Sequence, residues 1–185
     1  MKTSNKILLG ILCAIIFFFS AFQFSIHGYV KKIASENNIN EISNEIVSEV
    51  RSNLSFRKIS VNDGIQVFFR QDTISQIKVE APKNLLPYIK TEVKNKKLII
   101  SKTEKKKEKD TVRVFISNDK LDSLKVSSRG YFETVTIVSG KDLELEFSNN
   151  SKGRLELSYE SVTCVAVSGA KVKLTGDSKK IDFSN

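Results

Sequence analysis

Residues 165–176 read VAVSGAKVKLTG, which is an apolar strand pattern, a small polar turn and a second apolar strand pattern. Related units occur at 124–130 (LKVSSRG), 145–151 (LEFSNNS) and 181–185 (IDFSN). Small Ser, Asn and Gly residues suit a sharp corner, where a bulky side chain would clash. We therefore expect each unit to place its turn at a corner of the fold.

The units recur at a regular distance along the chain. Their leading apolar residues are 21, 20 and 16 residues apart, at Leu124, Leu145, Val165 and Ile181. The second apolar pairs are Val135 with Ile137, Leu155 with Leu157, and Val172 with Leu174. A period of about 20 residues is typical of a solenoid, in which each unit packs on its neighbours. The sequence thus predicts an all-β fold containing a short β-solenoid; an antiparallel sandwich with evenly spaced hairpins is the alternative.

The preceding part, from Leu54, alternates apolar and polar residues, as strands do. Asn62-Asp63-Gly64 is a strong signal for a tight turn between two strands. Pro87 favours a non-strand excursion over 83–93, with a short helical turn. This part is expected to consist of antiparallel or meandering strands joined by tight turns.

The N-terminal segment Ile7 to Ile26 is long and apolar. It reads ILLGILCAIIFFFSAFQFSI, contains no charge, and as a helix would cross a hydrocarbon core of about 30 Å. Lysines at positions 2 and 6 favour a cytoplasmic N-terminus with the rest of the chain outside the cytoplasm. We expect a single-pass anchor in the cell membrane or envelope. A cleaved signal peptide, which would leave a secreted or periplasmic protein, is the alternative.

Three regions follow from these patterns: the anchor at 1–32, a juxtamembrane linker or short helix at 33–53, and the β-solenoid domain at 54–185. In the linker, Ile39, Ile42, Ile46, Val47 and Val50 fit one face of a helix. The chain stops in the middle of a repeat unit. We expect either a longer native protein or a partner that covers this end.

Composition excludes several kinds of site. The lone histidine, His27, borders the apolar segment, so the folded domain lacks a histidine for catalysis. Cys13 lies in that segment and Cys164 is alone in the domain, which rules out an internal disulfide. Zinc would require Cys164 with carboxylates, an unusual ligand set. We predict no cofactor, no metal and no catalytic activity.

The net charge is +9, and without the first 32 residues, which hold four lysines and no acid, 26 basic and 21 acidic residues remain, which is a mild basic excess. Its most concentrated part is the run 94–110, KNKKLIISKTEKKKEKD. The residues that could contact a polyanion there are Lys102, Lys105, Lys106, Lys107 and Lys109. Such a loop can contact anionic lipid or glycan, or can be a solvated hairpin loop. Nucleic acid is not expected as a partner, because no aromatic residues interleave with the lysines.

Other polar and aromatic residues allow narrower hypotheses. Asp142, Glu144 and Glu146 alternate with apolar residues and are expected on an exposed strand face, although a calcium or sugar site is conceivable. Ser168 lacks the pattern of a nucleophile elbow. Cys164 is expected to pack as a small apolar residue. The aromatic residues that could stack on a sugar are Tyr131, Phe132 and Tyr159, with Phe132 favoured for the core.

The segment Phe56 to Asn185 resembles the family of putative auto-transporter adhesin head GIN domains, common in Bacteroidetes envelope proteins. The stretches that carry the resemblance are FRKISVNDGIQVFF at 56–69, KVEAPKNLLPYIKTEVKNKKLIIS at 78–101, VRVFIS at 112–117, LDSLKVSS at 121–128 and VAVSGAKVKLTG at 165–176. The resemblance implies a right-handed β-solenoid outside the cytoplasm and brings no catalytic residues. The family's later repeat units are missing from this chain, and only the corner at 168–170 matches closely.

Two functions of different classes follow. The first is a membrane-anchored, extracytoplasmic binding or adhesion module that holds a glycan or an envelope protein, with membrane lipid contacted through the N-terminal helix. The second is a polysaccharide-acting enzyme that uses two carboxylates on a β-solenoid scaffold. A structural or sensory envelope component without a ligand is a third option. The sequence leaves the oligomeric state open.

Overall fold

The structure, a computed structural model, describes residues 45–51, 55–103 and 111–184, which all belong to one compact unit, Glu45–Asn185. Within these ranges the chain is all-β, as predicted, with one short 3₁₀ turn. The elements are β1 (Ile46–Arg51), β2 (Lys58–Val61), β3 (Gln66–Gln71), β4 (Gln76–Pro82), η1 (Leu86–Tyr88), β5 (Ile89–Lys94), β6 (Lys97–Lys102), β7 (Arg113–Asn118), β8 (Ser123–Val126), β9 (Tyr131–Thr134), β10 (Val138–Phe147), β11 (Lys152–Ala166), β12 (Lys171–Thr175) and β13 (Lys180–Ser184).

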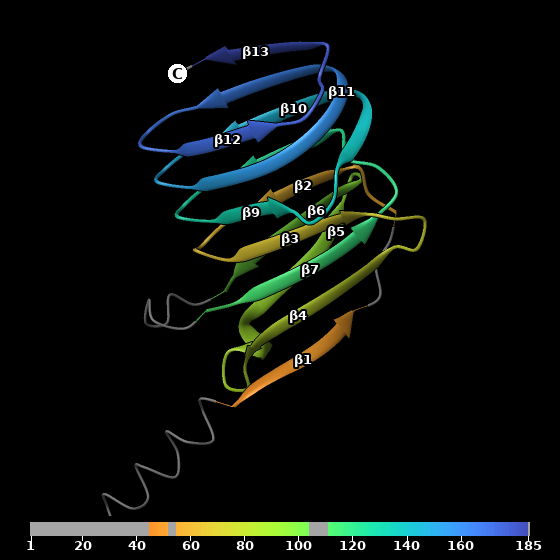
Figure 1. Ribbon diagram of the computed structural model, residues 1–185. Coiled ribbons are helices and arrows are strands. Elements are labelled where there is room, and N and C mark those ends of the chain that lie inside the picture. Colours follow the sequence, from red (N-terminus) through yellow and green to blue (C-terminus); the bar gives the residue numbers. More distant parts are fainter. Residues whose placement is uncertain (1–44, 52–54, 104–110, 185) are drawn as a thin grey trace, which may run out of the picture. The chain divides into compact units, whose positions relative to one another are not determined.

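The strands form one curled sheet with two arms that share β11 (Figure 1). The first arm has the order β1-β4-β7-β3-β9-β11-β12, and the second has the order β13-β11-β10-β8-β2-β6-β5. The first five residues of β11 pair with β12, whereas its last ten residues pair with β10 over most of their length. A single 15-residue strand therefore passes from one arm into the other.

Most neighbouring strands run parallel in a register that follows the repeat. Leu124 pairs with Leu145, Leu145 with Cys164, and Cys164 with Phe183. Antiparallel pairing joins β1 to β4, β4 to β7 and β5 to β6. The expectation of antiparallel or meandering strands before the repeats is thus correct for β4 with β7 and for β5 with β6, and wrong for β2 and β3, whose partners run parallel to them.

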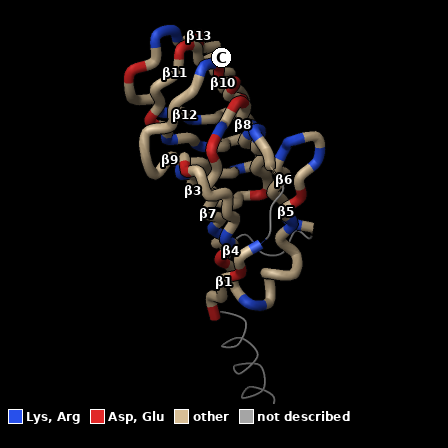
Figure 2. The backbone as a smooth tube through the Cα atoms, turned by 90° about the vertical axis from the view of Figure 1, so that its right-hand side faces the viewer, with Lys and Arg blue, Asp and Glu red and all other residues tan. Residues whose placement is uncertain are grey.

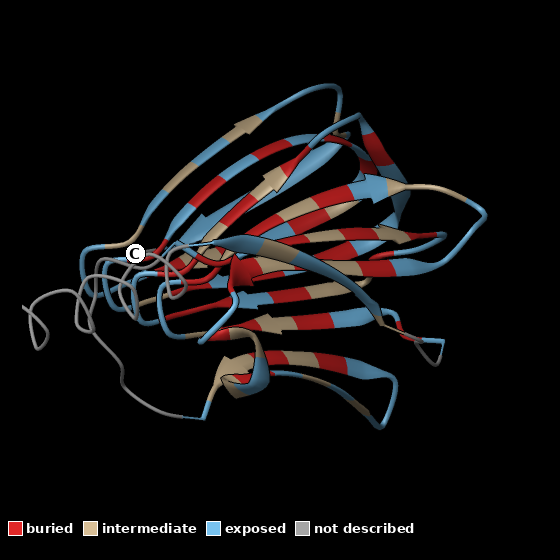
Figure 3. Ribbon diagram, turned by 90° about the horizontal axis from the view of Figure 1, so that it is seen from below, coloured by how far each residue is buried: buried red, intermediate tan, exposed pale blue. Residues whose placement is uncertain are grey.

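Alternation of side chains explains why these segments are strands. Along β11, Leu155, Leu157 and Tyr159 are buried while the residues between them are exposed. Figure 3 shows the same alternation of buried and exposed residues along most strands. The inward residues of both arms form one apolar core, in which the rings of Phe69 and Phe132 stack with centroids 6.1 Å apart. Burying each such side chain stabilises the fold by about 1.5–3 kcal/mol.

Three of the predicted corners, and the turn at 63–64 that was predicted to join two strands of a hairpin, have two successive residues with positive φ. These pairs are Asp63 with Gly64, Ser128 with Arg129, Asn149 with Asn150, and Ser168 with Gly169. Backbone hydrogen bonds stack one corner on the next, from Gly64 N to Ser128 O (2.9 Å), from Arg129 N to Asn149 O (2.9 Å) and from Asn150 N to Ser168 O (3.0 Å). The small polar residues therefore stand where the chain must adopt a left-handed conformation.

Three expectations about strands before the repeats need correction. Asn62-Asp63-Gly64 is not a hairpin turn, because β2 pairs with β6 and β8 while β3 pairs with β7 and β9. It is another corner of the stack. Residues 89–93, expected outside the strands, belong to β5, because pairing with β6 extends the chain as soon as η1 ends. Residues 46–51, expected in a linker or short helix, form β1 on the edge of β4.

Two apolar pairs of the repeats were also assigned wrongly. The inward residues of the third unit are Cys164 and Ala166, whereas Val165 is half-buried and Val167 is exposed. Val167 instead takes the corner position held by Ser127 and Ser148, one residue before each pair of left-handed residues. Val135 and Ile137 are exposed as well, because β9 ends at Thr134 and β10 begins at Val138.

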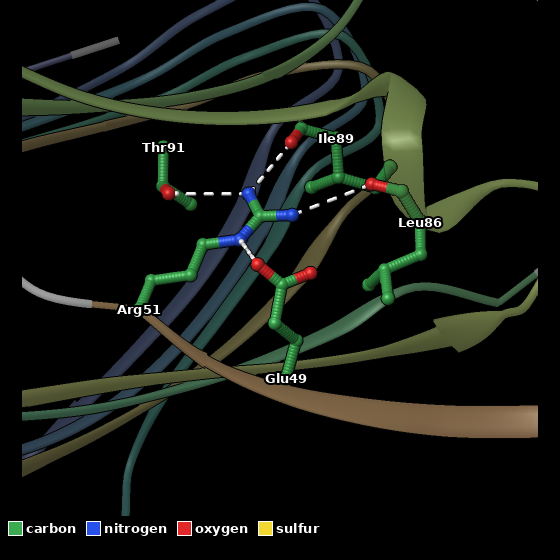
Figure 4. A network of polar contacts seen from close by, with 5 residues as sticks. All are labelled: Glu49, Arg51, Leu86, Ile89 and Thr91. Atoms are coloured by element: carbon green, nitrogen blue, oxygen red, sulfur yellow. Dashed lines mark hydrogen bonds and ion pairs between the residues drawn. The ribbon is translucent and has the colours of Figure 1, made fainter.

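Arg51 links the two arms where β1 forms the edge (Figure 4). Its guanidinium donates hydrogen bonds to the carbonyl oxygens of Ile89 (2.6 Å) and Leu86 (3.3 Å) and to Thr91 Oγ1 (3.2 Å). Its Nε also pairs with Glu49 at 3.3 Å. A side chain of β1 thereby satisfies carbonyl groups of η1 and β5 in the other arm.

Candidate functional site

Three aromatic side chains gather on the outer face of the first arm. Phe68 of β3, Phe115 of β7 and Tyr131 of β9 are half-buried and occupy the outward positions of their strands. Parallel pairing places Phe68 directly beside Phe115, with ring centroids 5.3 Å apart and planes inclined by 19°. Tyr131 meets Phe68 edge to face, with centroids 6.2 Å apart. We call these three residues the aromatic cluster.

The aromatic cluster borders a surface groove of about 340 Å³. The groove is lined by Phe68, Arg70, Gln76, Lys78, Glu80, Phe115, Ile116, Ser117 and Val135. Its volume is near the lower end of the range for small-molecule sites, about 300–1,000 Å³. The combination of apolar rings with amide, hydroxyl and charged groups suits a ligand that has both apolar and hydrogen-bonding surfaces, as a sugar has.

Lys78 connects the aromatic and charged sides of the groove. Its Nζ lies 5.8 Å from the centroid of the Phe115 ring, within the range of a cation–π interaction. The same Nζ pairs with Glu80 Oε1 at 2.7 Å. The lysine is therefore held against the ring, and its charge is partly balanced by Glu80.

Tyr131 has a fixed hydrogen-bond role at the margin of the aromatic cluster. Its hydroxyl donates to Glu133 Oε2 at 2.7 Å. Burial and this bond to the carboxylate raise the pKa of Tyr131 to about 12. The phenol occupies an acceptor oxygen of Glu133.

The predicted polyanion-contacting loop is only partly described by the structure. Lys102 is the last residue of β6 and is half-buried, and its backbone N–H donates to Asp63 Oδ2 at 3.2 Å. The other four lysines, Lys105, Lys106, Lys107 and Lys109, lie outside the described residues. The loop leads into β7 at Arg113, and its contact with a polyanion stays a prediction.

The acidic residues of β10 lie on an exposed strand face, as expected. Asp142, Glu144 and Glu146 all point outward, and Glu146 Oε1 pairs with Lys125 Nζ at 2.6 Å. In the described part of the chain, no group of three His, Cys, Asp or Glu residues could hold a metal ion. The three exposed carboxylates form a charged surface of the second arm.

The remaining candidates have structural positions. Cys164 is buried in the core, as predicted, and burial raises the pKa of its thiol to about 11. Phe132 also lies in the core, as expected. Tyr159 is buried, and its hydroxyl donates to the carbonyl oxygen of Leu121 at 2.7 Å, so it is not available for stacking on a sugar. Of the three aromatic residues proposed from the sequence, only Tyr131 reaches the outer face.

Sequence reasoning missed Phe68 and Phe115. The signal was available, because each is a large aromatic residue at the outward phase of a strand whose neighbours, Val67 and Phe69 or Val114 and Ile116, are buried. An outward-pointing phenylalanine on each of two strands indicates an apolar patch on the surface. That β3 and β7 lie side by side could not be derived from alternation alone.

The predicted membrane span, Ile7 to Ile26, lies outside the described residues. Across the ranges that the structure describes, no helix is long and apolar enough to cross a membrane.

Comparison with known proteins places most of the chain in one family. The family model described as "Putative auto-transporter adhesin, head GIN domain" matches residues 55–185. No curated protein matches the chain.

Solved structures share the fold at low sequence identity. One, described as a putative adhesin from Parabacteroides distasonis ATCC 8503, has a TM-score of 0.61 and 19% identity, with 76% of this chain and 69% of that chain covered. A putative lipid binding protein from the same strain has a TM-score of 0.57 and 15% identity over 71% of this chain and 67% of that chain. A putative adhesin from Parabacteroides merdae ATCC 43184 has a TM-score of 0.55 and 13% identity over 75% and 81%.

Proposed function

Because the chain belongs to the head GIN domain family, we propose that it is an extracytoplasmic binding or adhesion module, without catalytic activity, whose groove holds a glycan. The observation that supports this ligand is the aromatic cluster beside the groove. Half-buried rings there are surrounded by the guanidinium of Arg70, the amide of Gln76 and the hydroxyl of Ser117. Apolar rings with a few polar groups are typical of sites for small polar ligands.

The test is retention of the full-length protein, in detergent micelles, on a panel of immobilised polysaccharides. We expect retention on at least one polymer, with no release of shorter fragments from it. Truncating Phe68 and Phe115 together to alanine should weaken retention by about tenfold or more, because buried aromatic anchors dominate binding energy. The matched control is Ile99→Ala, which removes a half-buried apolar side chain from the outer face of β6 in the second arm. Release of fragments would favour the polysaccharide-acting enzyme.

The same proposal includes a membrane anchor formed by Ile7 to Ile26, with the N-terminus in the cytoplasm. The length of the uncharged segment supports it. N-terminal sequencing of the membrane-bound protein tests it. A start at Met1 would support the anchor, whereas a start near Tyr29 would indicate a cleaved signal and a secreted or periplasmic protein.

We also interpret the parallel stack as a short right-handed β-solenoid. The passage of β11 between two arms and the stacked corners support this interpretation. A crystal structure in which β11 did not bend between two sets of partners would contradict it.

A further inference from the structure

The outer face of the first arm has an uneven charge distribution, and we propose that its ligand is an anionic polysaccharide whose chain runs across the strands. This inference rests on the proposed glycan-binding function and narrows it to polymers that carry carboxylate, sulfate or phosphate groups. Its support is the identity, register and pairing of the charged residues on that face.

Strand alternation and register identify the side chains that point outward from this arm. The basic ones are Arg70, Lys78, Arg113, Lys152, Arg154, Lys171 and Lys173, and the acidic ones are Glu80, Glu133 and Glu156. Figure 2 shows charged residues of both signs along the strands of the molecule. On this face the basic residues are in the majority, which attracts polyanions.

One of the three acidic residues has a basic partner, since Glu80 pairs with Lys78. Glu133 accepts the neutral Tyr131 hydroxyl and keeps its charge. By contrast, six of the seven basic residues have no carboxylate within ion-pair distance among the described residues: Arg70, Arg113, Lys152, Arg154, Lys171 and Lys173. These cations are therefore available for the anionic groups of a ligand.

The register places two of these cations, Arg154 and Lys173, in one row with the aromatic pair. Across the strands, the row runs Lys78, Phe115, Phe68, Glu133, Arg154 and Lys173. Adjacent strands are about 4.8 Å apart, so the row is as long as several sugar units of a polymer. A polymer lying across the strands would contact the aromatic pair and also reach Arg154 and Lys173.

The aromatic pair offers a polymer an apolar contact beside the cations. The rings of Phe68 and Phe115 form a stacked pair with centroids 5.3 Å apart and planes inclined by 19°, and both residues line the groove. The groove beside these half-buried rings favours a polymer over a flat membrane surface, because a group of a polymer can enter the groove.

The second arm has the opposite character in its centre. Its strand β10 presents Asp142, Glu144 and Glu146 to solvent, and of these Glu146 pairs with Lys125. An acidic polymer is therefore expected to select the first arm over the second. This difference provides a control within the same molecule.

The experiment compares two polymers that share a backbone, polygalacturonate and its full methyl ester. The full-length protein in detergent micelles should bind the free acid at least about tenfold more tightly than the ester, and added salt should weaken this binding. Replacing Lys152, Arg154, Lys171 and Lys173 together by glutamine should weaken binding of the acid by about tenfold or more. The matched control removes four exposed lysines from the second arm, Lys58, Lys90, Lys94 and Lys97, and should leave binding within about twofold.

Each other outcome has a definite meaning. Equal binding of acid and ester would overturn the anionic ligand and leave the glycan-binding function standing. Binding of neither polymer, together with no retention on the wider panel, would overturn both. Equal losses in the two four-residue variants would show attraction by net charge alone and overturn the assignment to the first arm. Tighter binding to anionic lipid vesicles than to polygalacturonate would identify a membrane surface instead of a polymer.

Discussion

Gly176, between β12 and β13, lies where a side chain would collide with the backbone of a neighbouring strand. Its φ is 105°, and a Cβ atom added there would lie 2.1 Å from the carbonyl oxygen of Leu157. Since backbone atoms cannot move aside as a flexible side chain can, the contact forces the chain to shift. We expect Gly176→Ala to lower the free energy of unfolding by about 2–4 kcal/mol, measured by urea denaturation.

Gly64 provides the matched control at the residue scale. It also has positive φ, 68°, but an added Cβ would meet no atom within 4 Å. Gly64→Ala therefore changes only the backbone preference and should cost about 1 kcal/mol. Equal losses at both positions would mean that the chain around Gly176 relaxes and that the close contact has no energetic effect.

At the scale of elements, alternation predicted strands well and their partners poorly. The alternation that begins at Leu54 corresponds to strands with buried apolar residues in β2, β3, β4, β6 and β7, because period two is a local property of the chain. The neighbours of each strand were not identified, since Asn62-Asp63-Gly64 has the same residues whether it closes a hairpin or turns a corner. The groove was missed for this reason, as it depends on β7 lying between β3 and β4.

The strand β1 shows the limit of periodicity in short segments. Ile46, Val47 and Val50 fit a helical face and a strand equally well, and only pairing with β4 decides between them. Ile46 and Val50 remain exposed in the strand, so burial contributes little to holding it. The contacts of Arg51 with the second arm are then expected to account for much of its stability.

We expect Arg51→Ala to expose β1 to exchange and proteolysis. The substitution removes the Arg51 donor from the carbonyl oxygen of Ile89, at a cost of about 1–3 kcal/mol, while the carbonyl oxygen of Leu86 still accepts the Ile89 N–H. Hydrogen exchange of the amides in Ile46–Arg51 measures the effect. Lys83→Ala is the control, because Lys83 and Glu45 form a 3.8 Å pair that is 61% exposed on both sides, and such pairs contribute about 0–1 kcal/mol. Unchanged exchange in Arg51→Ala would show that backbone pairing alone holds β1.

At the scale of the whole compact unit, the stability that a side chain contributes depends on the place of its strand in the stack as well as on its register. Leu124, Leu145, Cys164 and Phe183 occupy equivalent places in four neighbouring strands. The first three are at most 2% exposed, whereas Phe183 is 51% exposed. The sequence repeat predicted this equivalence with an error of one residue, since it matched Val165 rather than Cys164 to Leu145. The alignment of each unit with the next is therefore set by its corner and not by its apolar pair.

Because burial falls from Leu145 to Phe183, we expect alanine substitutions at these two equivalent positions to have different effects on stability. Leu145→Ala removes a core side chain and should lower the free energy of unfolding by about 2–5 kcal/mol. Phe183→Ala removes a larger side chain at the equivalent place, yet it should cost less than about 1 kcal/mol, because half of that side chain already contacts solvent. Urea denaturation of both variants gives the two values. A loss at Phe183 as large as that at Leu145 would mean that Phe183 is covered in solution, and the oligomeric state of the protein would then show whether a second copy covers it.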